Sequence, residues 1–153
     1  MPRPYLVRSA IAAVLASSAV VAVPWSASAA DNQPPAQPQT SELNTDNQAC
    51  AAGPDRPFVR NRPTMSAVLR DPESRPVTAE FEVSWTDAAG DPQVRTLTDI
   101  GPKASGSTFS TVVPNDVPAF TEVSWRVRAY DGALWGQWSS AGGQSPCEFV
   151  YDY

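Results

Sequence analysis

Two arginines and two tryptophans in the last third of the sequence have the types and spacing best suited to specific chemistry. Arg126 and Arg128 alternate with apolar residues, so both point to the same side of an extended chain. Trp135 and Trp138 lie three residues apart, the repeat of a polyproline II helix, which also places them on one side. Because guanidinium groups stack well on indole faces, the spacing predicts a structural ladder of Arg126 and Arg128 on Trp135 and Trp138.

The same two indoles could instead contact a ligand. Indole faces pack against pyranose rings, so exposed Trp135 and Trp138 would form a carbohydrate-binding platform. Tryptophan and arginine are also the side chains that dominate protein-binding surfaces. Tyr130 lies near the end of the same extended stretch, where its hydroxyl can reach water, and it either packs at the rim of the fold or joins such a surface. We favour the ladder and keep both binding surfaces as alternatives.

Catalytic residues are hard to find in this sequence. The chain contains no histidine, so a serine nucleophile lacks its usual base. Lys103, the one lysine, forms no serine–lysine motif. A glycan hydrolase would need an acid and a base across a cleft. We consider Asp87 and Asp91 for these roles only as an alternative of a different class, because the small β-sandwich that the apolar pattern predicts, as described below, offers no obvious cleft. We expect no enzymatic activity.

Acidic residues in two predicted turns are the remaining candidates for a metal site. Asp71 and Glu73 share one turn, and Asp87 and Asp91 share the other. Calcium needs six to eight oxygen ligands gathered from such turns, but Arg75 stands where a further ligand would help. We therefore expect no metal and no cofactor.

The first thirty residues have the composition of a signal peptide. Arg3 and Arg8 precede an apolar run over residues 10–23, and Ala27–Ser28–Ala29 supplies small residues before a cleavage site. The apolar run is shorter than the roughly 20 residues that a membrane-spanning helix needs. We predict a signal peptide over residues 1–30 and a secreted, extracellular protein without membrane attachment after cleavage.

Cys50 and Cys147 are the only cysteines of the chain. In an exported protein such a pair is expected to form a disulfide. Closing a loop of about a hundred residues stabilises the folded state by up to about 4.7 kcal/mol in the chain-entropy model. A catalytic or metal-binding thiol is disfavoured because no histidine is present as a partner base or co-ligand.

Charge and composition limit the partners and the domain boundaries. Residues 31–153 carry nine basic and sixteen acidic residues, a net charge of −7, whereas nucleic acid and anionic membranes bind basic faces. We expect the protein to be a monomer whose partner is an extracellular protein or a glycan.

Residues 31–49 contain one leucine and no aromatic residue, too little apolar surface to offset the entropy of ordering them. We predict a flexible tether over residues 31–49 and a folded domain over residues 50–153.

Between the cysteines, apolar residues recur at every second position, which is the pattern of half-buried strands. Proline, glycine, aspartate and asparagine separate the runs, as turns require. A weaker run over residues 93–99 and an edge segment over residues 58–61 bring the total to about seven strands. The pattern predicts an all-β, antiparallel two-sheet sandwich of the immunoglobulin or fibronectin type III kind. The expected inward-facing residues are Met65, Ala67, Leu69, Ala79, Phe81, Val83, Trp85, Phe109, Thr111, Val113, Val123, Trp125, Val127, Ala129, Cys147, Phe149 and Tyr151.

Parts of the sequence also resemble known modules. The stretch VSWRVRAYDGALWGQWS resembles the sixth and seventh strand region of fibronectin type III domains, and PTMSAVLRDPESRPVTAEFEVSW resembles the second and third strands of immunoglobulin-like modules in large secreted bacterial proteins. WGQWS is similar to the tryptophan–serine box of cytokine-receptor fibronectin domains, with Gly136 in place of the first serine. The resemblance covers residues 50–151 and implies a secreted, non-catalytic binding, adhesion or spacer module.

Overall fold

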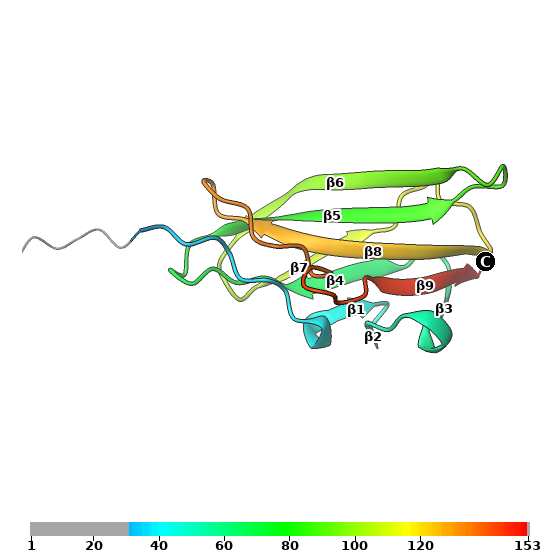
Figure 1. Ribbon diagram of the computed structural model, residues 1–153, viewed down its shortest axis with the longest axis horizontal. Helices are drawn as coiled ribbons and strands as arrows, with labels where there is room; N and C mark the ends of the chain where they lie inside the picture. The colour runs from blue at the N-terminus through cyan, green and yellow to red at the C-terminus, as the bar shows by residue number, and fades with distance from the viewer. Residues whose placement is uncertain (1–30, 153) are drawn as a thin grey trace, which may run out of the picture. The chain divides into compact units, whose positions relative to one another are not determined.

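Strands make up nearly all the regular structure of residues 31–152, the part of the chain that the computed structural model describes (Figure 1). One sheet has the order β2–β1–β4–β7, and the other has the order β3–β9–β8–β5–β6. The strands are β1 (Leu43–Thr45), β2 (Gln48–Ala49), β3 (Phe58–Arg60), β4 (Thr64–Val68), β5 (Val77–Thr86), β6 (Pro92–Lys103), β7 (Thr108–Val112), β8 (Thr121–Tyr130) and β9 (Cys147–Asp152), with short 3₁₀ helices at Thr40–Glu42 and Gly53–Asp55.

The two sheets form an immunoglobulin-like sandwich around one apolar core, as the alternating pattern predicts. Every residue expected to face inward is buried except Thr111, which is half-buried on an edge strand. The largest fully buried side chains are Trp125, Phe81, Phe109 and Phe149. All strand pairs are antiparallel except β3 with β9, which run parallel and align Val59 with Tyr151. This one parallel pair departs from the predicted all-antiparallel arrangement.

The segment predicted to be a tether, residues 31–49, is instead part of the sandwich. β1 pairs with β4, and Leu43 is only 2% exposed in the core. The buried hydroxyl oxygen of Thr45 accepts a hydrogen bond of 3.0 Å from the indole nitrogen of Trp125. A short edge strand needs only one or two inward side chains, so low apolar content did not exclude it. The prediction of a tether was wrong, and β1 and β2 raise the number of strands within residues 31–152 from the predicted seven or so to nine.

The disulfide between Cys50 and Cys147 is present, with an S–S distance of 2.05 Å. Cys50 follows β2 of one sheet, and Cys147 begins β9 of the other, so the bond links the two sheets.

The predicted signal peptide, residues 1–30, lies outside the described residues and stays a prediction. None of the helical turns within residues 31–152 is long and apolar enough to cross a membrane.

Candidate binding surface

The outer face of β8 carries a continuous stack of aromatic rings and guanidinium groups. The Arg128 Cζ lies 4.2 Å from the ring centroid of Trp135 and 4.4 Å from that of Trp138. The Arg126 Cζ lies 4.4 Å from the ring centroid of Trp138, and the centroids of Tyr130 and Trp135 are 4.7 Å apart. The structure therefore brings all five residues together, in the order Tyr130, Trp135, Arg128, Trp138, Arg126.

Strand geometry explains the stack. Successive outward side chains on β8 are about 6.6 Å apart, which leaves room for one flat ring between each pair. Two main-chain hydrogen bonds of 2.8 Å hold residues 135–139, here called the tryptophan segment, alongside β8. The N–H of Gly136 donates to the carbonyl of Ala129, and the N–H of Ser139 donates to the carbonyl of Val127. Trp135 is 43% exposed and Trp138 is half-buried. Because each indole lies between two stacking partners, the ring edges rather than the faces are open to solvent.

Two glutamates that the sequence analysis did not single out complete the ladder. β5 and β8 pair in a register that sets Glu80 opposite Arg128 and Glu82 opposite Arg126. In both pairs the arginine Nε donates a 2.8 Å hydrogen bond to the glutamate Oε1. Glu80 is 8% exposed, so the carboxylate is almost fully removed from water. The sequence does contain a signal for these pairs. Glu80 and Glu82 are two residues apart, as are Arg126 and Arg128, so each pair lies on one face of its strand.

Residues 31–39, here called the N-terminal strap, run against the tryptophan segment. The side-chain amide of Gln37 donates to the carbonyls of Trp138 at 3.1 Å and Ala141 at 3.0 Å. A Cβ atom on Gly136 would lie 2.6 Å from the carbonyl oxygen of Pro35. A side chain at position 136 would therefore clash with the strap, so this position favours glycine.

The acidic residues considered for calcium or for hydrolysis close their own turns. The Oδ1 of Asp71 accepts the N–H groups of Glu73 and Arg75. The Oδ1 of Asp87 accepts those of Ala89 and Asp91. The hydrogen bond from the Asp91 N–H is the main cause that lowers the pKa of Asp87, with further bonds from Ala89 and Gln93 outweighing desolvation. Asp87 and Asp91 thus share one hydrogen-bonded turn and do not face each other across a cleft.

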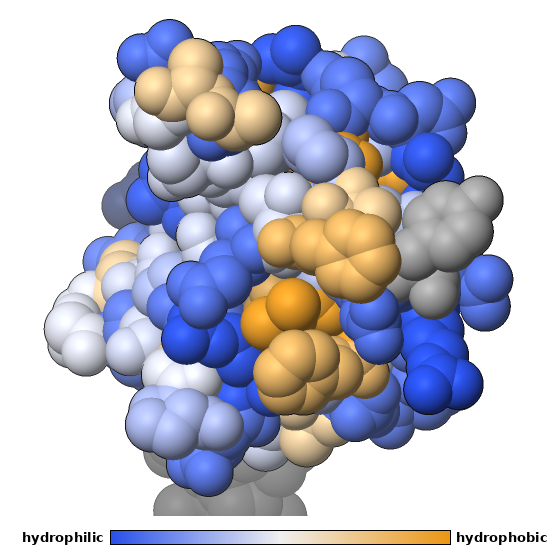
Figure 2. Space-filling model, turned by 90° about the vertical axis from the view of Figure 1, so that its right-hand side faces the viewer, coloured by the Kyte–Doolittle hydropathy of each residue, from blue (hydrophilic) through white to orange (hydrophobic). Residues whose placement is uncertain are grey.

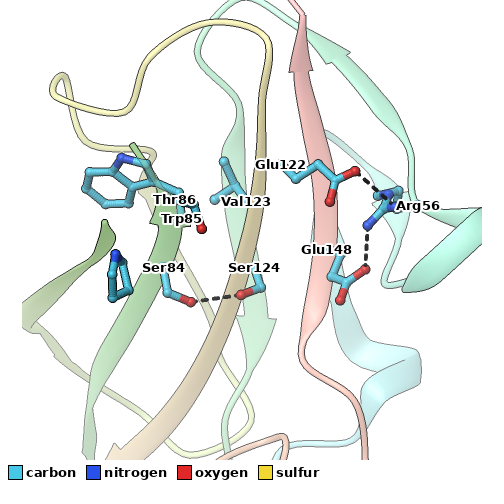
Figure 3. Close-up of a pocket in the computed structure, with 9 residues that line it drawn as sticks. Arg56, Ser84, Trp85, Thr86, Glu122, Val123, Ser124 and Glu148 are labelled. Atoms are coloured by element: carbon cyan, nitrogen blue, oxygen red, sulfur yellow. Dashed lines mark hydrogen bonds and ion pairs between the residues drawn. The ribbon is translucent and has the colours of Figure 1, made fainter. Parts of the chain in front are cut away.

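A shallow trough crosses the outer face of the five-stranded sheet, beside the ladder. Ser84 of β5 and Ser124 of β8 point toward each other there, with their hydroxyl oxygens 2.8 Å apart (Figure 3). Arg56 lies at one flank, 3.1 Å from carboxylate oxygens of both Glu122 and Glu148. The trough offers hydroxyl groups on its floor and mutually compensated charges on its wall.

One end of the sandwich carries exposed apolar side chains. Phe58 is 71% exposed at the start of β3, and Phe120 is 76% exposed just before β8. Between these strands, β9 places the half-buried Val150 opposite Phe58 and Glu122. Figure 2 shows apolar side chains gathered in the middle of this end and surrounded by polar ones. We call Phe58, Val150 and Phe120 the end patch.

Comparison with known proteins finds a similar solved structure but shows no family. No family model and no curated protein matches the chain. A solved structure of the PKD domain of an M14-like peptidase from Thermoplasmatales archaeon SCGC AB-540-F20 is similar to this chain. The sequences are 20% identical, the TM-score is 0.46, and the match covers 80% of this chain and 99% of the archaeal one.

The sequence-predicted residues thus fall into separate places on the sandwich. The three aromatic binding candidates, Tyr130, Trp135 and Trp138, lie in the ladder with both arginines. The two cysteines join the sheets near the middle of β8, where Cys147 is opposite Trp125. The end patch has no signal in the sequence, because Phe58 belongs to a short edge segment and Phe120 follows a stretch rich in turn residues.

Proposed function

We propose that this chain is a secreted, non-catalytic module of the fibronectin type III kind that binds an extracellular protein through the end patch. The observation that carries the proposal is the backbone conformation of the exposed residue Phe120. Its backbone has a φ of 61°, in the left-handed region that bulky residues rarely adopt. Holding a residue there costs about 1–3 kcal/mol, and such strain clusters at functional sites. At this position the strained backbone holds an aromatic ring in water rather than in the core.

The surroundings of Phe120 support a protein partner. The ring shares its end of the sandwich with Phe58 and Val150, whose strands are neighbours in the sheet. Exposed aromatic side chains grouped within a polar rim are typical of protein-binding surfaces. The excess of acidic residues in the exported part of the chain favours a partner with a basic face, because opposite charges speed association.

The two alternatives find less support in the geometry. A sugar platform needs free indole faces, whereas Trp135 lies between Tyr130 and Arg128, and Trp138 lies between two arginines. A hydrolase needs two carboxyl groups across a cleft, whereas Asp87 uses its carboxylate to hold its own turn. We therefore propose a structural role for the ladder and no catalytic role for the acids.

Photo-crosslinking combined with stability measurements tests this function. A photoreactive phenylalanine at position 120 should crosslink one extracellular protein of the producing organism, whereas the same group at position 112 should not. Val112 is the matched control, because it is also exposed and lies on the other sheet. The affinity for the captured partner is then measured with purified proteins.

Phe120→Gly gives the sharpest outcome. Glycine adopts positive φ without strain, so this variant should unfold at a higher temperature than wild type yet bind the partner at least tenfold more weakly. Phe58→Ser should also weaken binding, and Val112→Ser should not. Unchanged affinity in a Phe58→Ser, Phe120→Gly double variant would overturn the proposed function.

A further inference from the structure

The trough on the outer face of the five-stranded sheet consists of two adjoining hollows. One has a volume of about 310 Å³ and the other about 450 Å³, and both are lined by Ser84 and Ser124. The first extends toward Glu122, Glu148 and Arg56, as Figure 3 shows, and the second extends toward Arg126. The two hollows therefore form one elongated trough, which we call the serine trough.

Side-chain size explains why the sheet is hollowed here. The register places Val94, Ser84, Ser124 and Glu148 in one row across β6, β5, β8 and β9. The two central members of this row are serines, among the smallest outward side chains, while the neighbouring row holds the long side chains of Glu82 and Arg126. The floor is thus lower than its surroundings by the difference in side-chain length.

The charges around the serine trough nearly cancel. Arg56 makes ion pairs with Glu122 and Glu148, and Arg126 makes one with Glu82. Three carboxylates therefore face two guanidinium groups at close range. An anionic ligand would meet the carboxylates, and a strongly cationic one would meet the arginines, so the lining favours a neutral ligand.

On the floor of the serine trough, the available hydrogen-bonding groups are side-chain groups. The main chain of β5 and β8 is already paired on both sides within the sheet, whereas extended peptides bind to sheets chiefly through the unpaired main chain of an edge strand. The serine pair uses one hydroxyl hydrogen internally and leaves the other to donate, and each carboxylate keeps lone pairs that can accept. Such a set of hydroxyl and carboxylate groups matches the hydroxyl groups of a sugar.

From this geometry we propose that the serine trough binds a neutral oligosaccharide along the direction of β5 and β8. The site is distinct from the tryptophan ladder and does not use indole faces. It also goes beyond the proposed function, since it uses residues outside the end patch. The elongated shape favours a chain of several sugar residues over a monosaccharide.

The test uses an array of neutral and charged oligosaccharides with the exported protein. Wild type should bind at least one neutral oligosaccharide, and Ser84→Val should weaken that binding at least tenfold by filling the floor and removing a hydroxyl. Ser66→Val is the matched control, because Ser66 lies opposite Ser110 on the outer face of the other sheet and lines neither hollow. β-Branched residues suit strands, so both variants should fold.

A second measurement keeps the proposal falsifiable if Ser84→Val is unstable. Titration of wild type with the bound oligosaccharide should shift the amide resonances of Ser84 and Ser124 and leave those of Ser66 and Phe120 unchanged. Binding of charged oligosaccharides only, no binding to any neutral one, or equal binding by both valine variants would overturn it. Phe120→Gly should bind the oligosaccharide like wild type, so failure of the trough and failure of the end patch are distinguishable.

Discussion

The indole nitrogen of Trp125 donates a hydrogen bond to the hydroxyl oxygen of Thr45, 80 positions away in the chain and equally buried. Thr45→Val keeps the shape of the side chain but leaves the indole N–H without a partner. An unsatisfied buried donor costs about 1–3 kcal/mol, so the free energy of unfolding should fall by about 2 kcal/mol in urea titrations. Thr45→Ser retains the hydroxyl and should lose clearly less unfolding free energy than Thr45→Val. Equal losses in the two variants would show that the hydrogen bond contributes nothing to stability.

Arg128 is the central member of the ladder and the partner of the buried Glu80. Arg128→Met removes the cation and leaves a carboxylate that is 8% exposed without its counter-charge. Breaking such a pair costs about 3 kcal/mol, which should appear as a lower melting temperature. The loss should exceed that of Arg126→Met, because Glu82 is less buried than Glu80.

A double variant separates the charge of this pair from its packing. Glu80→Gln together with Arg128→Met removes both charges, and it should recover part of the stability that Arg128→Met loses. If the double variant recovers no stability relative to Arg128→Met, the lost stacking on the tryptophans, and not the unpaired buried carboxylate, accounts for the effect.

Gly136 is the point where the N-terminal strap approaches most closely. Gly136→Ala would place a Cβ atom 2.6 Å from the carbonyl oxygen of Pro35. Overpacking of this kind typically costs about 1–3 kcal/mol. Hydrogen exchange should show faster exchange of the Ala36 amide, which is bonded to the carbonyl of Arg70. In a chain that lacks residues 31–36 the same substitution should cost little, and an equal cost there would contradict the steric explanation.

Asp87, in the turn between β5 and β6, makes the stability of the protein depend on pH in the acidic range. The N–H of Asp91, together with those of Ala89 and the Gln93 amide, lowers the pKa of Asp87 from its ordinary value of about 3.9. A carboxyl group with a lowered folded-state pKa stabilises the protein above its ordinary pKa, and this contribution is lost as pH falls through the folded-state value. Asp87→Asn should therefore show a shallower loss of unfolding free energy below about pH 4. Parallel curves for the two proteins would contradict this.

The sandwich could be predicted from the sequence because its signals are local. Alternation along Ala79, Phe81, Val83 and Trp85 depends only on which side of a strand each residue faces, and all four are buried. The disulfide could be predicted for a different reason: Cys50 and Cys147 are the only cysteines, so only one pairing is possible.

The remaining features depend on contacts between distant segments. In the sequence, Leu43 is an isolated leucine in a polar stretch. Its burial depends on the pairing of β1 with β4, which cannot be recognised from the sequence alone. The pairs Glu80–Arg128 and Glu82–Arg126 require the register of β5 with β8. The serine trough likewise exists only because that register sets Ser84 against Ser124.

The disulfide also determines how the protein would carry mechanical load. A force applied at residues 31 and 152 reaches Cys50 from one side and Cys147 from the other, and the covalent bond passes it directly between them. The 96 residues between the cysteines then lie outside the path of tension. Only β1, β2 and the part of β9 after Cys147 can be pulled directly from their sheets. β3 would then lose β9, its only neighbour in the sheet, whereas β4 to β8 should stay folded when a neighbouring surface draws the ends apart.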